Sequence, residues 1–159
     1  MQRQIKRIAL VALVTAAPAF AWNRADDIPV ESLPPAVRAV LDRYTQILKE
    51  SPSLDEAADA FAQIAGGSLV NDNGSVSSNT KQFGLKKDFN NIKHYAWPIR
   101  ITRVNKTVSR GEGYGTKKIA GDRYTIWIAK DDAAKGMPAP VSIIAPPSGE
   151  PKVVNVGSY

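Results

Sequence analysis

Cysteine is absent from this chain of 159 residues, and His94 is its single histidine. A chain without cysteine forms no disulfides, so its stability has to come from a packed core, which a domain of this length can build. Zinc and other transition metals prefer thiolate and imidazole ligands, and the carboxylates are scattered along the sequence. We therefore expect neither a metal site nor a cofactor, and a lipid anchor on cysteine is excluded.

Long apolar stretches are also missing. The apolar run at residues 8–17 is about ten residues long, whereas a helix needs roughly 20 apolar residues to cross a bilayer. Basic residues precede the run, and Ala-Phe-Ala at 19–21 follows it, which is typical of a secretory signal peptide. The basic residues are Arg3, Lys6 and Arg7. The sequence thus predicts removal of residues 1–21, a mature chain that begins near Trp22, and export to the periplasm or the medium. A retained membrane anchor is the alternative.

Basic residues outnumber acidic ones unevenly along the chain. The whole sequence has 21 Lys and Arg against 15 Asp and Glu, and without residues 1–21 the counts become 18 and 15, a net charge of +3. Residues 22–80 carry a net charge of −5, residues 81–130 carry +9, and residues 131–159 carry −1. Because salt screens electrostatic fields beyond about 8 to 10 Å, the local excess in 81–130 matters more than the total.

Two helices are predicted at the start of the mature chain. Ser32 is placed to cap the first helix, two prolines suit its first turn, and Pro52 ends it. Its apolar residues recur at helical spacing and are Val37, Val40, Leu41, Tyr44, Ile47 and Leu48. Ser53 and Glu56 form a capping box that starts the second helix, and a Gly-Gly pair ends it. Phe61 belongs to the apolar stripe of this second helix, so we expect it to be buried.

Residues 93–130 predict one long β-hairpin with a glycine-rich turn. Apolar side chains share one face of its two strands at a spacing of two. They are Tyr95, Trp97, Ile99, Ile101, Tyr124, Ile126 and Ile128. We expect this face, Trp97 included, to lie in the core, with a bulge near Thr102 where the alternation changes phase. Arg123 and Trp127 then lie on the opposite face.

The remaining segments complete a mixed domain. They are a short strand at 68–70, a loop at 71–80, a short helix at 85–92, and strands at 141–145 and 152–156. The sequence therefore predicts one α+β domain at residues 32–159, preceded by a flexible lead-in at 22–31. In this domain, two N-terminal helices pack on a curved antiparallel sheet of four to five strands. The order of elements resembles the cystatin and NTF2-like cone folds over about residues 33 to 157. That resemblance implies a long helix across a bent sheet, in a fold that hosts enzymes, binding modules and assembly subunits.

Catalytic motifs are few. His94 would suit the base of an NTF2-like isomerase or dehydratase, but it alternates with Tyr95 and Trp97 and so points away from the predicted core face. The glycine-rich segment 111–118 has the wrong spacing for a phosphate-binding loop and leads into a strand instead of a helix. The aromatic and basic residues of the hairpin would also suit single-stranded nucleic acid, although the core accounts for most of these aromatic residues.

We therefore predict a non-enzymatic binding or interaction module and assign no catalytic residue. Its contact surface is expected on the basic face of the hairpin and consists of Arg100, Arg103, Lys117, Lys118, Arg123 and Trp127. Such a surface favours an anionic partner, which is an acidic protein, lipid headgroups, or a small carboxylate or phosphate ligand. The alternative is a small NTF2-like enzyme, of isomerase or hydrolase type, with a pocket between the first helix and the sheet. A solvated face that only keeps a sheet edge from pairing is the non-functional interpretation.

Overall fold

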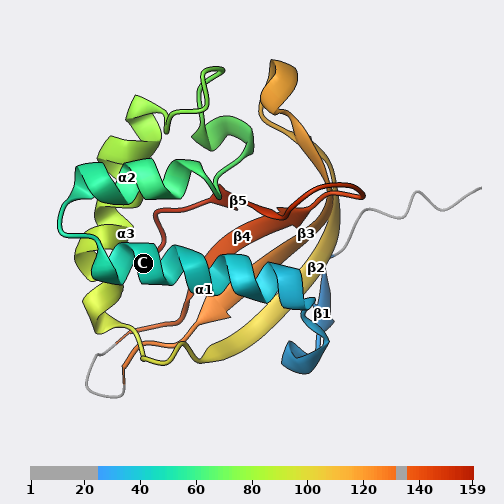
Figure 1. Cartoon of the computed structure of the whole chain (residues 1–159). Coiled ribbons are helices and arrows are strands. Elements are labelled where there is room, and N and C mark those ends of the chain that lie inside the picture. Colours follow the sequence, from blue (N-terminus) through green and yellow to red (C-terminus); the bar gives the residue numbers. More distant parts are fainter. Residues whose placement is uncertain (1–24, 132–135) are drawn as a thin grey trace, which may run out of the picture.

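The computed structural model describes residues 25–131 and 136–159. The helices are α1 (Pro35–Glu50), α2 (Leu54–Ala62) and α3 (Lys86–Asn91), and the strands are β1 (Asp26–Ile28), β2 (Ile101–Glu112), β3 (Ile119–Ile128), β4 (Ala139–Ala145) and β5 (Lys152–Asn155). The strands form one antiparallel sheet in the order β1-β2-β3-β4-β5. Figure 1 shows α1 lying across the sheet, with α2 and α3 beside α1. The described residues thus form an α+β domain with three α-helices and one five-stranded antiparallel sheet, and the predicted α+β class is confirmed.

The predicted signal peptide at residues 1–21 lies outside the described residues. Part of the predicted lead-in is described and differs from a loose segment, because β1 pairs with β2 through Asp27 opposite Asn105. Ser32 was predicted to cap α1, and this prediction is wrong. Its hydroxyl instead donates to the carbonyl of Pro29 at 2.7 Å, and Pro34 precedes the first turn of α1.

Apolar side chains fill the space between α1 and the sheet. Those from α1 are Val37, Leu41, Tyr44, Ile47 and Leu48. Those from the sheet are Val104, Tyr124, Ile126, Ile128, Val141, Ile143 and Val153. Phe61 of α2 is fully buried, and its ring centroid lies 5.2 Å from that of Tyr44. Because aromatic side chains bury a large area and favour such tilted contacts, Phe61 joins the two helices. Its predicted burial is confirmed.

The predicted first strand of the hairpin begins later than expected. Residues 92–94 form a short 3-10 turn, and β2 starts only at Ile101. Pro98 lacks a backbone donor and so cannot take part in a regular ladder. The side chain of Trp97, the preceding residue, is 48% exposed. The Lys49 ammonium lies 4.1 Å from the centroid of its ring. The predicted burial of Trp97 is therefore wrong, whereas the predicted bulge at Thr102 is confirmed by the register shift between Ile101 and Arg103.

The chain also covers the outer edge of β5. After α2 the backbone runs parallel to that strand, where the Gly66 amide donates to Val153 at 2.9 Å and the Val153 amide donates to Ile64 at 2.8 Å. Residues 67–69 then form a 3-10 turn where a strand was predicted, beginning at Gly67 with a φ of +62°. A Cβ on Gly113 would come within 2.6 Å of the Gly67 backbone. The end of the β2–β3 hairpin therefore rests against this turn.

A buried carboxylate holds the C-terminal segment. Asp88 of α3 is 1% exposed and accepts three hydrogen bonds, from the Tyr44 hydroxyl at 2.6 Å, the Gly157 amide at 2.7 Å and the Tyr159 amide at 2.8 Å. Asn91 adds a bond to the Tyr159 carbonyl at 2.9 Å. Because buried polar groups are costly when unpaired, these bonds join α1, α3 and the C-terminal segment as one unit.

The contrast between Phe61 and Trp97 can be measured directly. Phe61→Ala should lower the free energy of unfolding by about 3 to 5 kcal/mol, because it leaves a cavity in the core. Trp97→Ala should cost about 1 kcal/mol, since it removes a half-exposed ring and one cation–π contact. Chemical denaturation of both variants gives the two values. Equal losses would contradict the placement of Trp97 at the surface.

Replacing the buried carboxylate should destabilise the fold. Asp88→Asn turns an amide NH₂ toward groups that are themselves donors, so the loss at neutral pH should be on the order of 1 to 3 kcal/mol. Burial raises the pKa of Asp88, and the bonds from Tyr44, Gly157 and Tyr159 oppose this rise. Urea unfolding of the wild type and the variant across the acidic to neutral range measures both effects.

The pH dependence has a definite sign. The pKa of Asp88 in the folded state lies above its unfolded value near 3.8. The stability that this group contributes is therefore greatest below that value and declines as pH rises through the folded pKa. The stability difference between the wild type and Asp88→Asn should be largest in acid and shrink toward neutral pH. A difference that grows with pH would contradict the raised pKa.

Candidate functional site

Three of the six predicted contact residues share the sheet face that points away from α1. Along β3, the side chains of Tyr124, Ile126 and Ile128 are buried against the helices. Because side chains alternate along a strand, Arg123 and Trp127 lie on the opposite face, as predicted. Arg103 of β2 pairs directly with Trp127 in the sheet register and joins them there.

Arg103 is held by an intramolecular partner. Its Nε donates to Asp27 Oδ1 at 2.8 Å, and its guanidinium carbon lies 4.8 Å from the centroid of the Trp127 ring. Asn105 also donates to Asp27. The hydrogen bond from Arg103 is the main reason why the pKa of Asp27 is lowered. The guanidinium of Arg103 is thus paired with this carboxylate.

Arg123 has two partners on the same face. It forms an ion pair with Glu112, and its Nη2 donates to the Ser142 hydroxyl at 3.2 Å. Arg123 also pairs in register with Ile144, which is fully buried. The charge of Arg123 is therefore paired with Glu112, and its alkyl stem lies beside Ile144 of the neighbouring strand. Lys106 is matched in the same way by Asp122 at 2.7 Å, and this bond raises the pKa of Lys106.

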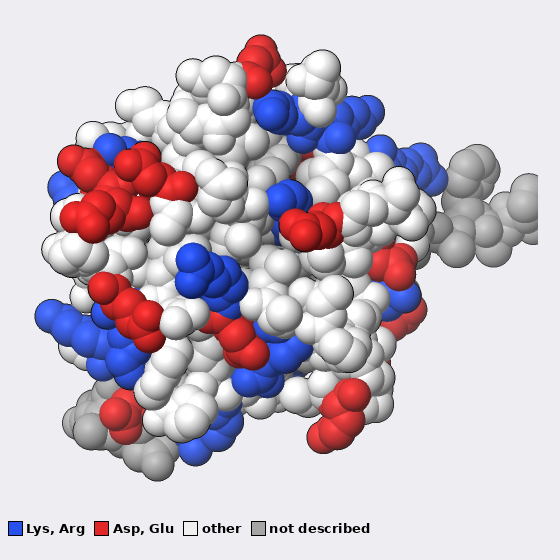
Figure 2. All heavy atoms as spheres, in the orientation of Figure 1, with Lys and Arg blue, Asp and Glu red and all other residues white. Residues whose placement is uncertain are grey.

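Lys117 and Lys118 occupy the end of the hairpin, in and beside the 3-10 turn η5 (Gly115–Lys117). Neither lysine forms an ion pair with a carboxylate of the described residues. Figure 2 shows Lys and Arg side chains gathered at the top of the view, where Figure 1 places this hairpin end, while acidic side chains gather over α2. Arg100 is exposed at the other end of β2. The predicted surface is therefore split into a strand face with paired arginines and a tip with two lysines.

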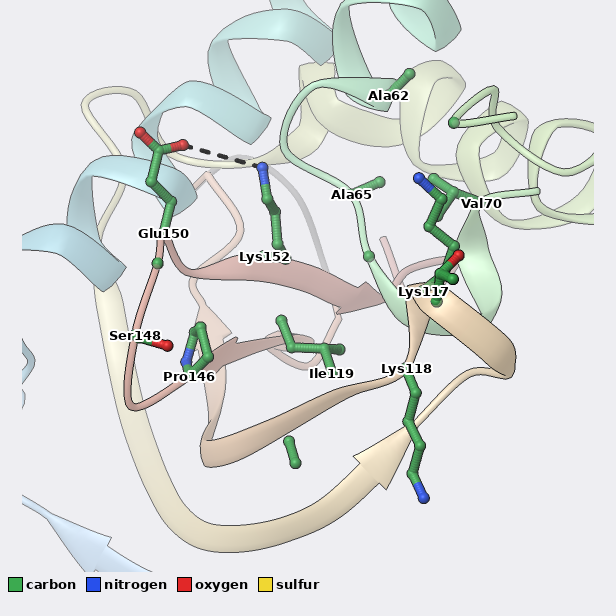
Figure 3. Close-up of a pocket in the computed structure, with 15 residues that line it drawn as sticks. Ala62, Ala65, Val70, Lys117, Lys118, Ile119, Pro146, Ser148, Glu150 and Lys152 are labelled. Carbon is green, nitrogen blue, oxygen red and sulfur yellow. Dashed lines mark ion pairs between the residues drawn. The ribbon is translucent and has the colours of Figure 1, made fainter. Parts of the chain in front are cut away.

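A cavity of about 440 Å³ opens beside this tip. It lies between α2 with the segment that follows it, the start of β3, and the loop from β4 to β5 (Figure 3). Its apolar lining comprises Ala62, Ala65, Val70, Ile119, Ala120 and Pro146. Its polar and charged lining comprises Thr116, Lys117, Lys118, Ser148, Glu150 and Lys152. Both tip lysines thus belong to a concave site, which the sequence did not indicate.

Lys152 is the residue of this cavity that sequence reasoning missed. Its Nζ donates to the Gln63 carbonyl at 2.7 Å and lies 4.0 Å from the Glu150 carboxylate. Figure 3 shows the side chain of Lys118 pointing away from those of Lys117 and Lys152. No local pattern identifies Lys152, because it reaches the cavity only through the pairing of β5 with residues 64–66.

His94 is exposed, and none of the described side chains hydrogen-bonds its imidazole. It borders a second hollow of about 430 Å³, together with Lys130, Tyr95 and Tyr159. A general base needs a positioned partner, and the described residues supply none to His94. The buried carboxylate of Asp88 lines neither cavity. It lies next to the second hollow, because it accepts a hydrogen bond from the amide of Tyr159, which borders that hollow. The described part of the chain also contains no group of three or more His, Cys, Asp or Glu that could bind a metal.

Within residues 25–131 and 136–159, no helix is both long and apolar enough to cross a membrane. Comparison of the chain with protein-family models, with curated proteins and with solved structures gives no match.

The internal use of Arg123 can be tested with a double-mutant cycle. Arg123→Gln and Glu112→Gln should show a coupling energy of about 1 kcal/mol, because both side chains are less than one third exposed and their charges face each other. Chemical denaturation of the two single variants and the double variant gives this value. A coupling energy near zero would mean that the guanidinium is available to other partners.

Proposed function

We propose that this chain is an exported, non-enzymatic binding module that uses the end of its basic β-hairpin to contact an anionic partner or ligand. The observation that carries the proposal is the contrast between paired and unpaired charges. Arg103 and Arg123 have carboxylate partners within the domain, whereas Lys117 and Lys118 have none among the described residues. A cation without an internal partner keeps its full electrostatic attraction for an external anion.

Export is part of the same proposal and rests on the first 21 residues. Their basic start, short apolar run and Ala-Phe-Ala segment are typical of a cleaved signal peptide. An NTF2- or cystatin-like arrangement also belongs to the proposal. The 16-residue helix α1 that crosses a five-stranded antiparallel sheet supports it.

The packing favours a binding module over a cone-fold enzyme. Such an enzyme would need a cavity between α1 and the sheet, with titratable groups converging on it. The α1 side chains that face the sheet include Val37 and Leu41, both fully buried, and Tyr44, whose hydroxyl is engaged by Asp88. The cavity beside the hairpin end lies elsewhere, and the charged residues of its lining are three lysines and one glutamate. Recognition of an anion is the chemistry that these residues can perform.

Charge reversal at the tip should weaken partner binding. Lys117→Glu combined with Lys118→Glu should reduce capture of partners from an envelope extract by about tenfold at low salt. The fold should stay intact, because exposed charges contribute little to stability. The difference from the wild type should shrink as salt is raised, since screening removes the same attraction. Quantitative mass spectrometry of the captured proteins at two salt concentrations measures both effects.

A matched control uses two basic residues away from the tip. Lys86 and Lys93 are exposed and do not line the cavity. Lys86→Glu combined with Lys93→Glu changes the net charge by the same amount. This control should retain partner capture. Equal recovery of every captured protein by the wild type and the tip variant at low salt would end the proposal.

A further inference from the structure

We propose that the cavity beside the hairpin end binds a small molecule with an apolar body and one anionic group, such as a carboxylate, phosphate or sulfonate. This inference rests on the proposed function and names its ligand. The cavity volume of about 440 Å³ falls in the range of small-molecule sites, roughly 300 to 1,000 Å³. It is therefore large enough for one such molecule.

Small side chains keep the interior of the cavity open. Ala62 and Ala65 come from α2 and the segment after it, Gly66 follows, and Pro146 lies on the opposite side. The space beside Gly66 is tight toward β5, because a Cβ there would lie 2.9 Å from Lys152 Cβ. These side chains are apolar or absent, so the interior suits a hydrocarbon or aromatic group.

The backbone around the cavity is held in place. Residues 64–66 are bonded to β5 through both the Gly66 and the Val153 amides. The hairpin end packs against Gly67, so the wall that the hairpin contributes is also held in place. A wall that is ordered before a ligand arrives loses little conformational entropy on binding. The cavity is thus a preorganised site.

Cationic side chains enter the cavity from separate elements. Lys117 comes from the hairpin end and Lys152 from β5, whereas the side chain of Lys118 points away from both (Figure 3). Glu150 is the acidic lining residue, and its side chain is 87% exposed and 4.0 Å from Lys152. Without Lys118, two lysines against one glutamate leave a net charge of +1 at the cavity. Lys152 uses one of its three N–H donors on Gln63, so the others remain for a ligand.

These features exclude other occupants. A metal cation would be repelled by the lysines. A long polyanion would require a basic track that extends beyond the cavity, yet the neighbouring strand arginines are matched by Asp27 and Glu112. A single anionic group on an apolar body uses both the lysines and the apolar lining.

The test uses a pair of fluorescent probes with the same rings. Anilinonaphthalene sulfonate has an apolar aromatic body and one anionic group, and phenylnaphthylamine has the same rings without the sulfonate. Titration of the folded full chain should show that the sulfonate binds at least about threefold to tenfold more tightly than the neutral probe. Equal affinity, or no saturable binding of either probe, would overturn the inference.

Variants then assign the binding to this cavity. Lys117→Gln should weaken sulfonate binding about threefold to tenfold and leave the neutral probe unchanged. Arg110→Gln removes the same charge from the hairpin outside the cavity and should change neither affinity. Ala62→Leu adds bulk to the lining and should weaken both probes. Unchanged binding by Lys117→Gln and Ala62→Leu, each with the wild-type melting temperature, would overturn the assignment.

The ligand inference and the proposed function can fail separately. If Ala62→Leu loses probe binding but captures partners as the wild type does, the cavity takes the ligand and the partner contacts another part of the tip. If the tip double variant loses partner capture while no probe binds the wild type, the proposed function stands and the ligand inference is refuted. If the probes bind as expected but the tip double variant captures partners normally, the cavity site stands without a macromolecular partner.

Discussion

The arrangement of the helices and the C-terminal segment depends on the hydrogen bonds that the buried Asp88 carboxylate accepts. One buried side chain receives the Tyr44 hydroxyl from α1 and two backbone amides from residues 157 and 159. Desolvation makes a buried carboxylate costly, and three donors offset part of that cost, although burial still raises the pKa of Asp88. The ring centroid of Tyr159 in turn lies 4.8 Å from that of Tyr95. Tyr95 belongs to the segment that precedes β2. The segment that leads into β2 is therefore positioned by the same unit.

Charged side chains of the sheet form ion pairs between neighbouring strands. Strand residues of opposite sign face each other across neighbouring strands, as in Arg103 with Asp27 and Lys106 with Asp122. Such pairs order long side chains without adding much stability when they are exposed. The basic excess of residues 81–130 is thereby reduced along the strands and retained at the hairpin end. This local imbalance, and not the net charge of the chain, directs the proposed binding to one place.

Periodicity in the sequence predicted what depends on neighbours along the chain. The alternation in β3 placed Tyr124 inside and Trp127 outside, and the phase change at Thr102 located the bulge. Trp97 was misplaced because its spacing matched the strand, whereas Pro98 ends regular pairing there. The cavity lining could not be predicted, because Ala62 and Lys152 are 90 positions apart and meet only through the parallel pairing of 64–66 with β5. Local patterns carry no information on such a long-range pairing.

The coverage of β5 by residues 64–66 has a consequence for the behaviour of the protein at high concentration. An exposed strand edge presents free amides and carbonyls that can pair with a neighbouring molecule and start aggregation. Here the Val153 amide and carbonyl are both occupied by the protein's own backbone. A neighbouring molecule therefore cannot add a strand at that position. The protein is protected there against edge-to-edge polymerisation without a charged or prolyl residue in the middle of the strand.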